Sequence, residues 1–153
     1  MSVKVYLDNC CYSRPYDDQT QNRIRFETQA KLQIQKYISE GKLELVSSFV
    51  LRYENSKKNN EMVRDSIDYF ISRYARLYIS HQLKKEIGSI AKKVMETGID
   101  PIDSAHIACA VLAGCEFFIT VDDGILKRRY DSIEIIDPIR FIKEVNECTR
   151  RLN

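Results

Sequence analysis

Residues 117–121 form a run in which four of five neighbouring side chains are apolar. A continuous apolar run of this length is typical of a β-strand that is covered on both faces. Such strands belong to parallel sheets, because the connections between parallel strands place helices on both sides of the sheet. The whole chain alternates strand-like with helix-like segments. We therefore predict an α/β fold, with a central, mostly parallel sheet and helices on both faces.

Local signals predict the other elements. Residues 3–7 alternate apolar and polar side chains, as a strand does. A helix predicted over 22–40 ends at Gly41. Asp100 and Pro101 form a helix start, with aspartate as the N-cap and proline at the first helical position. The remaining predicted elements are strands over 43–46 and 133–136 and helices over about 48–58, 61–77, 82–95, 102–113 and 139–148.

Composition narrows the class of protein. A chain of 153 residues, 44% of them hydrophobic, is predicted to form a single domain over residues 1–153. No apolar run approaches the ~18 residues of a membrane span, and the N-terminus has no signal-peptide core, so we expect no membrane association. The five cysteines include no C-x-x-C pair, which disfavours a zinc site and favours a reduced, cytoplasmic protein. With a net charge of only +2, nucleic-acid binding would depend on a local patch.

Four acidic residues stand where the strands and helices of such a sheet meet at one edge. Asp8 ends the first strand, Glu54 lies in the second turn of the helix that leaves the second strand, and Asp122 follows the apolar run. Asp103 lies in the first turn of the helix that leads into that run and is antiparallel to it. Because ligands of open parallel sheets bind beyond the carboxyl ends of the strands, we expect the four carboxylates to converge there.

Each of these acids also has a purely structural explanation. Asp8 can form an Asx turn, Asp103 can favour the helix dipole, and Asp122 can cap the next turn. Glu54 can form a surface ion pair, which is worth little. Taken singly, none of the four identifies a site.

Asp103 is the hardest of the four to explain structurally. The residues three, four and seven places later on its helix are His106, Ile107 and Ala110. Its carboxylate therefore points into a partly dry region, where it needs a cation or hydrogen bonds to stay ionised. No lysine or arginine stands close to Asp8 or Asp103 in the sequence. Carboxylates without a basic partner take up protons or bind a metal, and Mg²⁺ or Mn²⁺ suits oxygen ligands.

A metal site of this kind suits phosphodiester hydrolysis, because the metal lowers the pKa of a bound water. We expect Asp8 and Asp103 to be the central ligands. Glu54 and Asp122 are expected to complete the shell or to act through waters, and Thr120 to orient a ligand carboxylate or the water.

Four short motifs carry these acids: Val5-Tyr6-Leu7-Asp8-Asn9, Ser47-Ser48-Phe49-Val50-Leu51-Arg52-Tyr53-Glu54, Ile102-Asp103-Ser104-Ala105-His106-Ile107-Ala108-Cys109-Ala110 and Phe118-Ile119-Thr120-Val121-Asp122. Together they resemble the motifs of PIN-domain nucleases and, within that family, of the VapC-like toxins of toxin–antitoxin pairs. The resemblance implies a three-layer α/β/α sandwich and an endoribonuclease that cleaves single-stranded RNA with Mg²⁺ or Mn²⁺. It also implies frequent homodimers and, for toxins, a partner antitoxin protein that blocks the acidic pocket.

The resemblance also assigns roles to residues. It carries the catalytic and metal-binding roles onto Asp8, Glu54, Asp103 and Asp122, and a supporting role onto Asn9 and Thr120. Asp123 directly follows Asp122, so which of these two acids faces the metal stays open, and Asp123 is kept as a supporting residue.

An anionic strand that approaches an acidic pocket needs positive charge at its rim. The candidates that closely follow a proposed ligand in the sequence are Arg14, Lys57, Lys58, Lys127 and Arg128. The alternative is that these residues only solvate the surface.

Two other functions are compatible with parts of the pattern. One is a non-catalytic PIN-fold module that binds RNA or a protein, although all four acids are present. The other is a phosphatase with Asp8 as nucleophile, which needs a second acid two residues later, where Cys10 stands, and a lysine that the sequence does not place. His106 is expected to be a buried histidine that is hydrogen-bonded to its neighbours, and not a general base.

Overall fold

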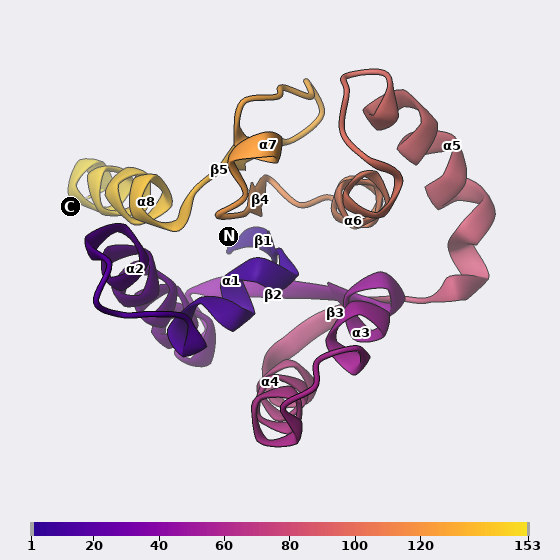
Figure 1. The fold of residues 1–153 in the computed structure, drawn as a ribbon. Coiled ribbons are helices and arrows are strands. Elements are labelled where there is room, and N and C mark those ends of the chain that lie inside the picture. Colours follow the sequence, from indigo (N-terminus) through magenta and orange to yellow (C-terminus); the bar gives the residue numbers. More distant parts are fainter. Residues whose placement is uncertain (1, 153) are drawn as a thin grey trace.

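The computed structural model describes residues 2–152, with side chains up to residue 147. Within these residues, five parallel strands form one sheet in the order β3-β2-β1-β4-β5 (Figure 1). The strands are β1 (Val3–Leu7), β2 (Leu43–Ser48), β3 (Ala75–Ile79), β4 (Phe117–Ile119) and β5 (Glu134–Ile136). Because β1 pairs with both β2 and β4, the strand that leads to Asp8 lies in the middle of the sheet.

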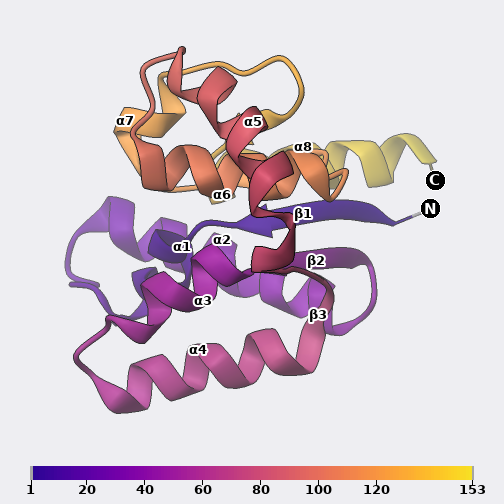
Figure 2. The ribbon, with the colours of Figure 1, turned by 90° about the vertical axis from the view of Figure 1, so that its right-hand side faces the viewer.

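Helices cover both faces of this sheet. On one side, α1 (Asn9–Ser13) lies beside α2 (Asn22–Ser39), which packs against α8 (Pro138–Leu152); on the other side, α5 (Lys84–Met95) packs against α6 (Pro101–Leu112). Figure 2 shows α5 and α6 in front of the sheet, with α3 (Phe49–Ser56) and α4 (Glu61–Tyr74) below them. The shorter elements are η1 (Arg14–Tyr16), η2 (His81–Leu83) and α7 (Asp123–Leu126). The predicted three-layer α/β/α architecture is confirmed.

Two predicted boundaries were wrong, and one strand and two short helices were missed. The helix predicted over 61–77 ends at Tyr74, because residues from Ala75 onward pair in parallel with β2. This strand lies at the edge of the sheet and exposes Leu77 and Tyr78, so it lacks the alternating burial that marks a strand in a sequence. The apolar run predicted as a strand over 117–121 is a strand only to Ile119. The short helices α1 and α7 were also not predicted.

The helix that carries Asp103 begins as the sequence predicts. Asp100 is the N-cap of α6, its side chain accepts a hydrogen bond from the backbone N of Asp103 at 2.9 Å, and Pro101 occupies the first helical position. Half of the twelve residues of α6 are buried, including His106 and Ile107. The helix α6 therefore holds Asp103 at the edge of the core, on the side of the sheet where β1 and β4 end.

The remaining sequence-based predictions are met with small changes in length. The helix α2 ends just before Gly41, whose φ of 77° suits a helix terminus. The last helix, α8, covers the predicted 139–148, although the side chain of Cys148 lies outside the described residues. Among residues 2–152, no helix has both the length and the apolar character that crossing a bilayer requires.

Candidate functional site

The carboxyl ends of β1 and β4 meet around Asp8. Its backbone N donates to the Ile119 carbonyl at 2.9 Å, which continues the β1–β4 ladder by one residue. The carboxylate is 4% exposed and accepts hydrogen bonds from the backbone N of Asn9 at 2.7 Å and from Thr120 Oγ1 at 2.8 Å. Thr120, which is fully buried, is therefore a donor to the Asp8 carboxylate. The result is a buried carboxylate with a fixed orientation.

Glu54 and His106 approach Asp8 from α3 and α6. The His106 Nε2 atom is hydrogen-bonded to Glu54 Oε1, and ligand atoms of Asp8, Glu54 and His106 all lie within 4.8 Å of one another. His106 was predicted to be buried and hydrogen-bonded to its neighbours, and it is fully buried with a bond at each ring nitrogen. The identity of the partners, Tyr6 and Glu54, was not predicted, because both are distant in the sequence.

Asp103 belongs to the same acidic group, which we define as Asp8, Glu54, Asp103 and Asp122. Burial raises the pKa of Asp103 to about 8, and a hydrogen bond with Asp100 and the negative charges of Asp8, Asp100 and Asp122 act in the same direction. Asp103 therefore lies close enough to these acids to respond to their charge. A carboxyl group in this position keeps its proton near neutral pH unless a cation compensates the charge.

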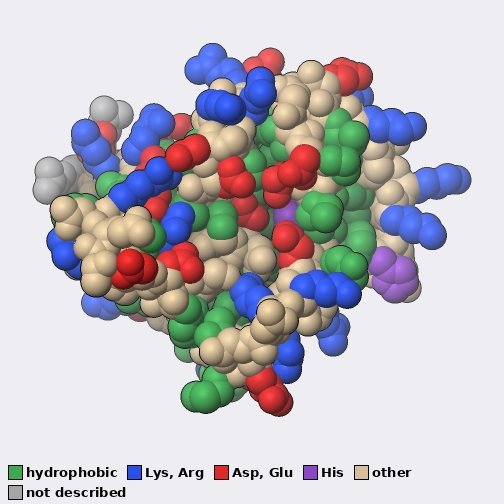
Figure 3. Space-filling model, in the orientation of Figure 1, with side chains coloured by type: hydrophobic (Ala, Val, Ile, Leu, Met, Phe, Trp, Pro, Cys, Tyr) green, Lys and Arg blue, Asp and Glu red, His purple; other side chains and the backbone are tan. Residues whose placement is uncertain are grey.

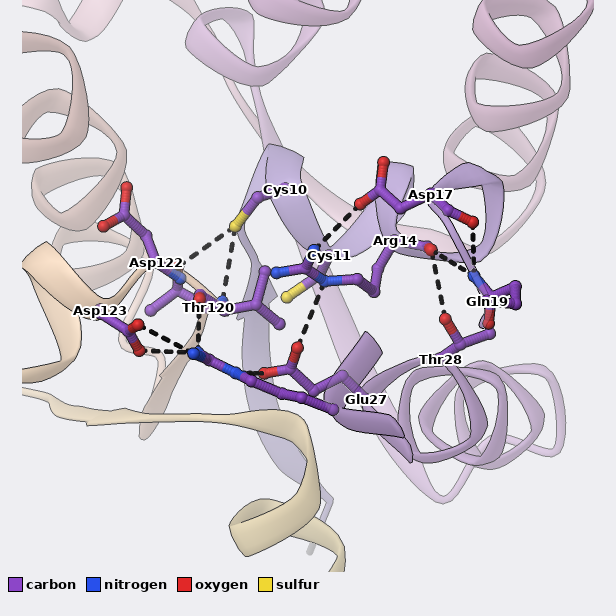
Figure 4. A network of polar contacts seen from close by, with 12 residues as sticks. Cys10, Cys11, Arg14, Asp17, Gln19, Glu27, Thr28, Thr120, Asp122 and Asp123 are labelled. Carbon is purple, nitrogen blue, oxygen red and sulfur yellow. Dashed lines mark hydrogen bonds and ion pairs between the residues drawn. The ribbon is translucent and has the colours of Figure 1, made fainter. Parts of the chain in front are cut away.

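The side chains of the neighbouring acids Asp122 and Asp123 make different contacts. The Asp122 carboxylate accepts from the Gly124 backbone N at 2.8 Å and acts on the pKa of Asp103. The Asp123 carboxylate is bound by both terminal nitrogens of Arg23, at 2.6 and 2.9 Å, and this contact lowers the pKa of Asp123 (Figure 4). Of the two, Asp122 therefore faces the acidic group, and Asp123 anchors α7 to α2.

A buried carboxylate organises the side of the site that faces α2. Glu27 is 2% exposed and pairs with Arg14 Nε at 3.3 Å and with Arg23 Nε at 3.4 Å (Figure 4). Arg14 also pairs with Asp17 at 3.1 Å. Arg14, predicted to contact substrate, is thus tied into an internal network, which leaves it little freedom to follow a ligand.

The other predicted cations differ in their distance from the acids. Lys58 Nζ donates to Asn9 Oδ1, beside Asp8, although the sequence placed no lysine near that acid. Lys57 extends over the ring of Tyr53, with Nζ 4.8 Å from its centroid. Lys127 and Arg128 lie beyond α7, and the Arg128 guanidinium packs against Gly98. Of the predicted substrate-binding residues, Lys58 is the one whose contacts place it at the acidic group.

Cys10 is a further residue at the site that the sequence assigned only to packing. Its Sγ lies 3.4 Å from Asp8 Oδ2 and 3.3 Å from Thr120 Oγ1. The cysteine occupies the position two residues after Asp8 where the phosphatase alternative needs an acid. That alternative is therefore not supported, even though Lys58 supplies a nearby lysine.

The donor set fits a divalent cation. Carboxylate oxygens converge beside His106, and the pKa of Asp103 is raised first by burial and further by a hydrogen bond with Asp100 and by the charges of Asp8, Asp100 and Asp122. Figure 3 shows acidic side chains gathered in the middle of one face, with lysines and arginines around them. Mg²⁺ and Mn²⁺ accept such oxygen-rich ligand sets. The arrangement can hold a cation next to an anionic substrate.

Comparison with solved structures supports the fold. The crystal structure of VapBC2 from Rickettsia felis, bound to a DNA fragment from its promoter, contains a similar chain: the TM-score is 0.54 and the identity 14%, over 88% of this chain and 98% of that one. FitAcB from Neisseria gonorrhoeae gives 0.53 and 13%, over 88% and 97%. FitAB bound to the IR36 DNA fragment gives 0.51 and 16%, over 88% and 95%. No protein-family model matches the sequence, and no curated protein is significantly similar to it. At these identities the likeness shows a shared fold.

Proposed function

We propose that this chain is a divalent-metal-dependent endoribonuclease that hydrolyses single-stranded RNA. Its fold is shared with chains of the VapBC2 and FitAB complexes. One observation carries the proposal. Asp8, Glu54 and Asp103, which are far apart in the sequence, lie together at the edge where β1 and β4 end. Carboxylates gathered in this way, without a neutralising partner for each, call for a cation.

The residues divide the work. Asp8, Glu54, Asp103 and Asp122 would hold the cation, and Asn9 and Thr120 would fix the orientation of Asp8. When bound, Mg²⁺ or Mn²⁺ supplies a hydroxide nucleophile at neutral pH by lowering the pKa of water and offsets charge on the phosphate. The buried position of Asp8 excludes bulk water from one side of the reaction. Asp103 would give up its proton when the cation compensates the surrounding charge.

Substrate would enter along the positively charged rim. Lys57 and Lys58 directly follow α3 on one side of the acidic group, and Lys127 and Arg128 follow α7 on the other. Lysine and arginine side chains bind phosphates without reading the sequence, so they would favour a flexible single strand over any particular RNA. This part of the proposal is supported by the contact of Lys58 with Asn9 and by the positions of the other three residues along the fold.

A direct assay tests the activity. Purified protein, shown to be free of bound partners, is mixed with labelled single-stranded RNA and Mn²⁺ or Mg²⁺, with EDTA as the control. We expect cleavage that EDTA abolishes and that Asp103→Asn lowers by orders of magnitude without loss of the fold. If several RNAs stay intact under these conditions, the alternative of a non-catalytic RNA- or protein-binding module takes its place.

We also propose a toxin role with an antitoxin as partner, and a homodimer, in the cytoplasm. Support comes from the neighbours, which were solved as VapBC2 and FitAB assemblies with DNA, and from exposed apolar side chains such as Tyr16, Met62 and Tyr69. Cys10, Cys11, Cys109 and Cys115 are free thiols, as a reducing compartment requires. Light scattering of the purified chain tests the dimer, because a mass near that of one chain would exclude it.

A further inference from the structure

A lysine held by an asparagine flanks the acidic group on the α3 side. Lys58 Nζ donates to Asn9 Oδ1 and, at 2.9 Å, to Asn55 Oδ1. Asn9 directly follows Asp8 and donates its backbone N to the Asp8 carboxylate at 2.7 Å. The ammonium group is therefore held one residue away from the most buried member of the acidic group.

The orientation of the Asn55 amide follows from its other contacts. Asn55 is fully buried, and its Nδ2 donates to Asp68 Oδ1 at 2.7 Å and to the Arg64 carbonyl at 3.1 Å. A side-chain amide has two N–H hydrogens, and both are given to acceptors in α4. The oxygen of Asn55 must therefore face Lys58. Arg64 also donates to the Lys58 carbonyl at 3.3 Å, so α4 holds the lysine at its backbone as well.

The charge of Lys58 is held close to acids without entering an ion pair. Within the described part of the chain, its hydrogen-bond partners are two neutral amide oxygens, and it makes no salt bridge. Burial lowers the pKa of Lys58, while the charges of Glu54, Asp68 and Asp8 oppose that shift. An ammonium group has three N–H donors and two are used, so one remains for an anionic ligand.

We propose that Lys58 is a catalytic residue that binds an oxygen of the scissile phosphate, and that Asn55, fixed by Asp68, is the positioning residue that holds it there. The inference rests on the proposed nuclease function and specifies the phosphate contact of that same site. A donor held in place before the reaction stabilises developing charge more than a mobile one does. Lys57, which lies over the exposed ring of Tyr53, is suited only to binding the strand.

Steady-state kinetics on single-stranded RNA with Mn²⁺ test this assignment. Lys58→Met is expected to lower kcat by roughly 100- to 1,000-fold, as removal of a fixed donor to the reacting group does. Asn55→Leu keeps the charge of Lys58 but removes the hydrogen bond that holds its ammonium group, and it is also expected to lower kcat. Lys93→Met, an exposed lysine of α5, is the matched control and should leave kcat unchanged. A Lys58→Met variant with the kcat of the wild type would overturn the proposal.

The double variant separates positioning from a general structural role. If Asn55 acts through Lys58, Asn55→Leu combined with Lys58→Met is no slower than Lys58→Met alone. A further loss in the double variant would overturn the positioning role. If Asn55→Leu does not fold, Asp68→Ala replaces it, because Asp68 is exposed and its loss frees the Asn55 amide to turn. The same non-additivity with Lys58→Met is then expected.

RNA binding without metal distinguishes failure of this inference from failure of the proposed function. Binding of a fluorescent single-stranded RNA in EDTA is measured over a range of KCl concentrations. Each phosphate contact contributes about −0.7 to the slope of log K against log salt, so Lys58→Met should make the slope shallower by about that amount. An unchanged slope would contradict the phosphate contact. Absence of cleavage by the wild type, with the expected change in slope, would overturn the nuclease function and the catalytic role but retain the phosphate contact.

Discussion

The Tyr6 hydroxyl lies 2.7 Å from Nδ1 of His106, whose other ring nitrogen is hydrogen-bonded to Glu54. The hydroxyl is also 2.6 Å from Ser48 Oγ. These contacts form a series of hydrogen bonds that a neutral histidine satisfies. In it, Ser48 donates to Tyr6, Tyr6 donates to His106 Nδ1, and His106 Nε2 donates to the Glu54 carboxylate. Burial raises the pKa of Tyr6, which keeps the hydroxyl protonated and able to donate. This series of hydrogen bonds links Tyr6, in the interior of the sheet, to the orientation of Glu54 in the site.

Tyr6→Phe tests that link. The ring stays stacked on Phe118, but the His106 Nδ1 atom loses its donor, which leaves a buried polar atom unpaired. We expect unfolding to become easier by about 1–3 kcal/mol and Mn²⁺ affinity to fall by roughly 10- to 100-fold, as loss of a group that orients a ligand does. Isothermal titration with Mn²⁺ and thermal denaturation measure the two effects.

Tyr16→Phe is the matched control for this substitution. Tyr16 is 52% exposed, so removal of its hydroxyl should change neither the Mn²⁺ affinity nor, beyond about 0.5 kcal/mol, the stability. Wild-type Mn²⁺ affinity in Tyr6→Phe would show that Glu54 does not depend on the series of hydrogen bonds through His106.

Asp103 makes the stability of the metal-free protein depend on pH. Its pKa rises from 3.8 to about 8 on folding, so between these values the folded state retains a proton that the unfolded state has lost. The contribution of this group to stability is therefore complete below pH 3.8 and is lost as the pH rises through about 8. Asp103→Asn removes the dependence and should raise the melting temperature more at pH 8 than at pH 5.

Thermal denaturation in EDTA at the two pH values measures this effect. Asp131→Asn, at an exposed position, is the control and should shift the melting temperature equally at both. If Asp103→Asn also shifts the melting temperature equally at both pH values, the pKa of Asp103 is not raised by folding. With Mn²⁺ present, the wild type should have the higher melting temperature of the two proteins, because only the wild type has the Asp103 carboxylate to bind the cation.

Two glycines are predicted to respond in opposite directions to substitution by alanine. Gly98 has a φ of 99°, which strains any residue with a Cβ atom, and a Cβ there would lie 2.9 Å from Arg128 Cζ. Gly98→Ala should destabilise the protein by about 1–3 kcal/mol. Gly88 lies inside α5 with open space around it, so Gly88→Ala should stabilise by about 1 kcal/mol. Urea denaturation compares them, and equal effects would contradict the backbone argument.

Much of the fold was predictable because its signals are local. The alternation of β1, the cap of α6 and the apolar run of β4 each need only a few neighbouring residues. The edge strand β3 was not predictable in this way, because its pairing with β2 decides its conformation and its side chains are largely exposed. Short helices such as α1 lack the length that periodicity needs.

The site likewise contains residues whose positions the sequence predicts and residues whose positions depend on long-range contacts. The ends of parallel strands predict where Asp8 and Asp122 lie, since topology alone brings them together. The choice between Asp122 and Asp123 depends on Arg23, a hundred residues away, and no local pattern contains it. The position of Lys58 likewise depends on the packing of α3 against α4 through Asn55. Contacts of this kind arise only from the assembled fold.

Binding of Mn²⁺ tests the central claim most directly. Electron paramagnetic resonance of free Mn²⁺ is recorded while the ion is titrated into metal-free wild-type protein and into Asp8→Asn. We predict saturable binding by the wild type that Asp8→Asn abolishes or weakens by at least tenfold, with the fold intact by circular dichroism. Equal binding by the two proteins, or no binding by the wild type, would contradict the account.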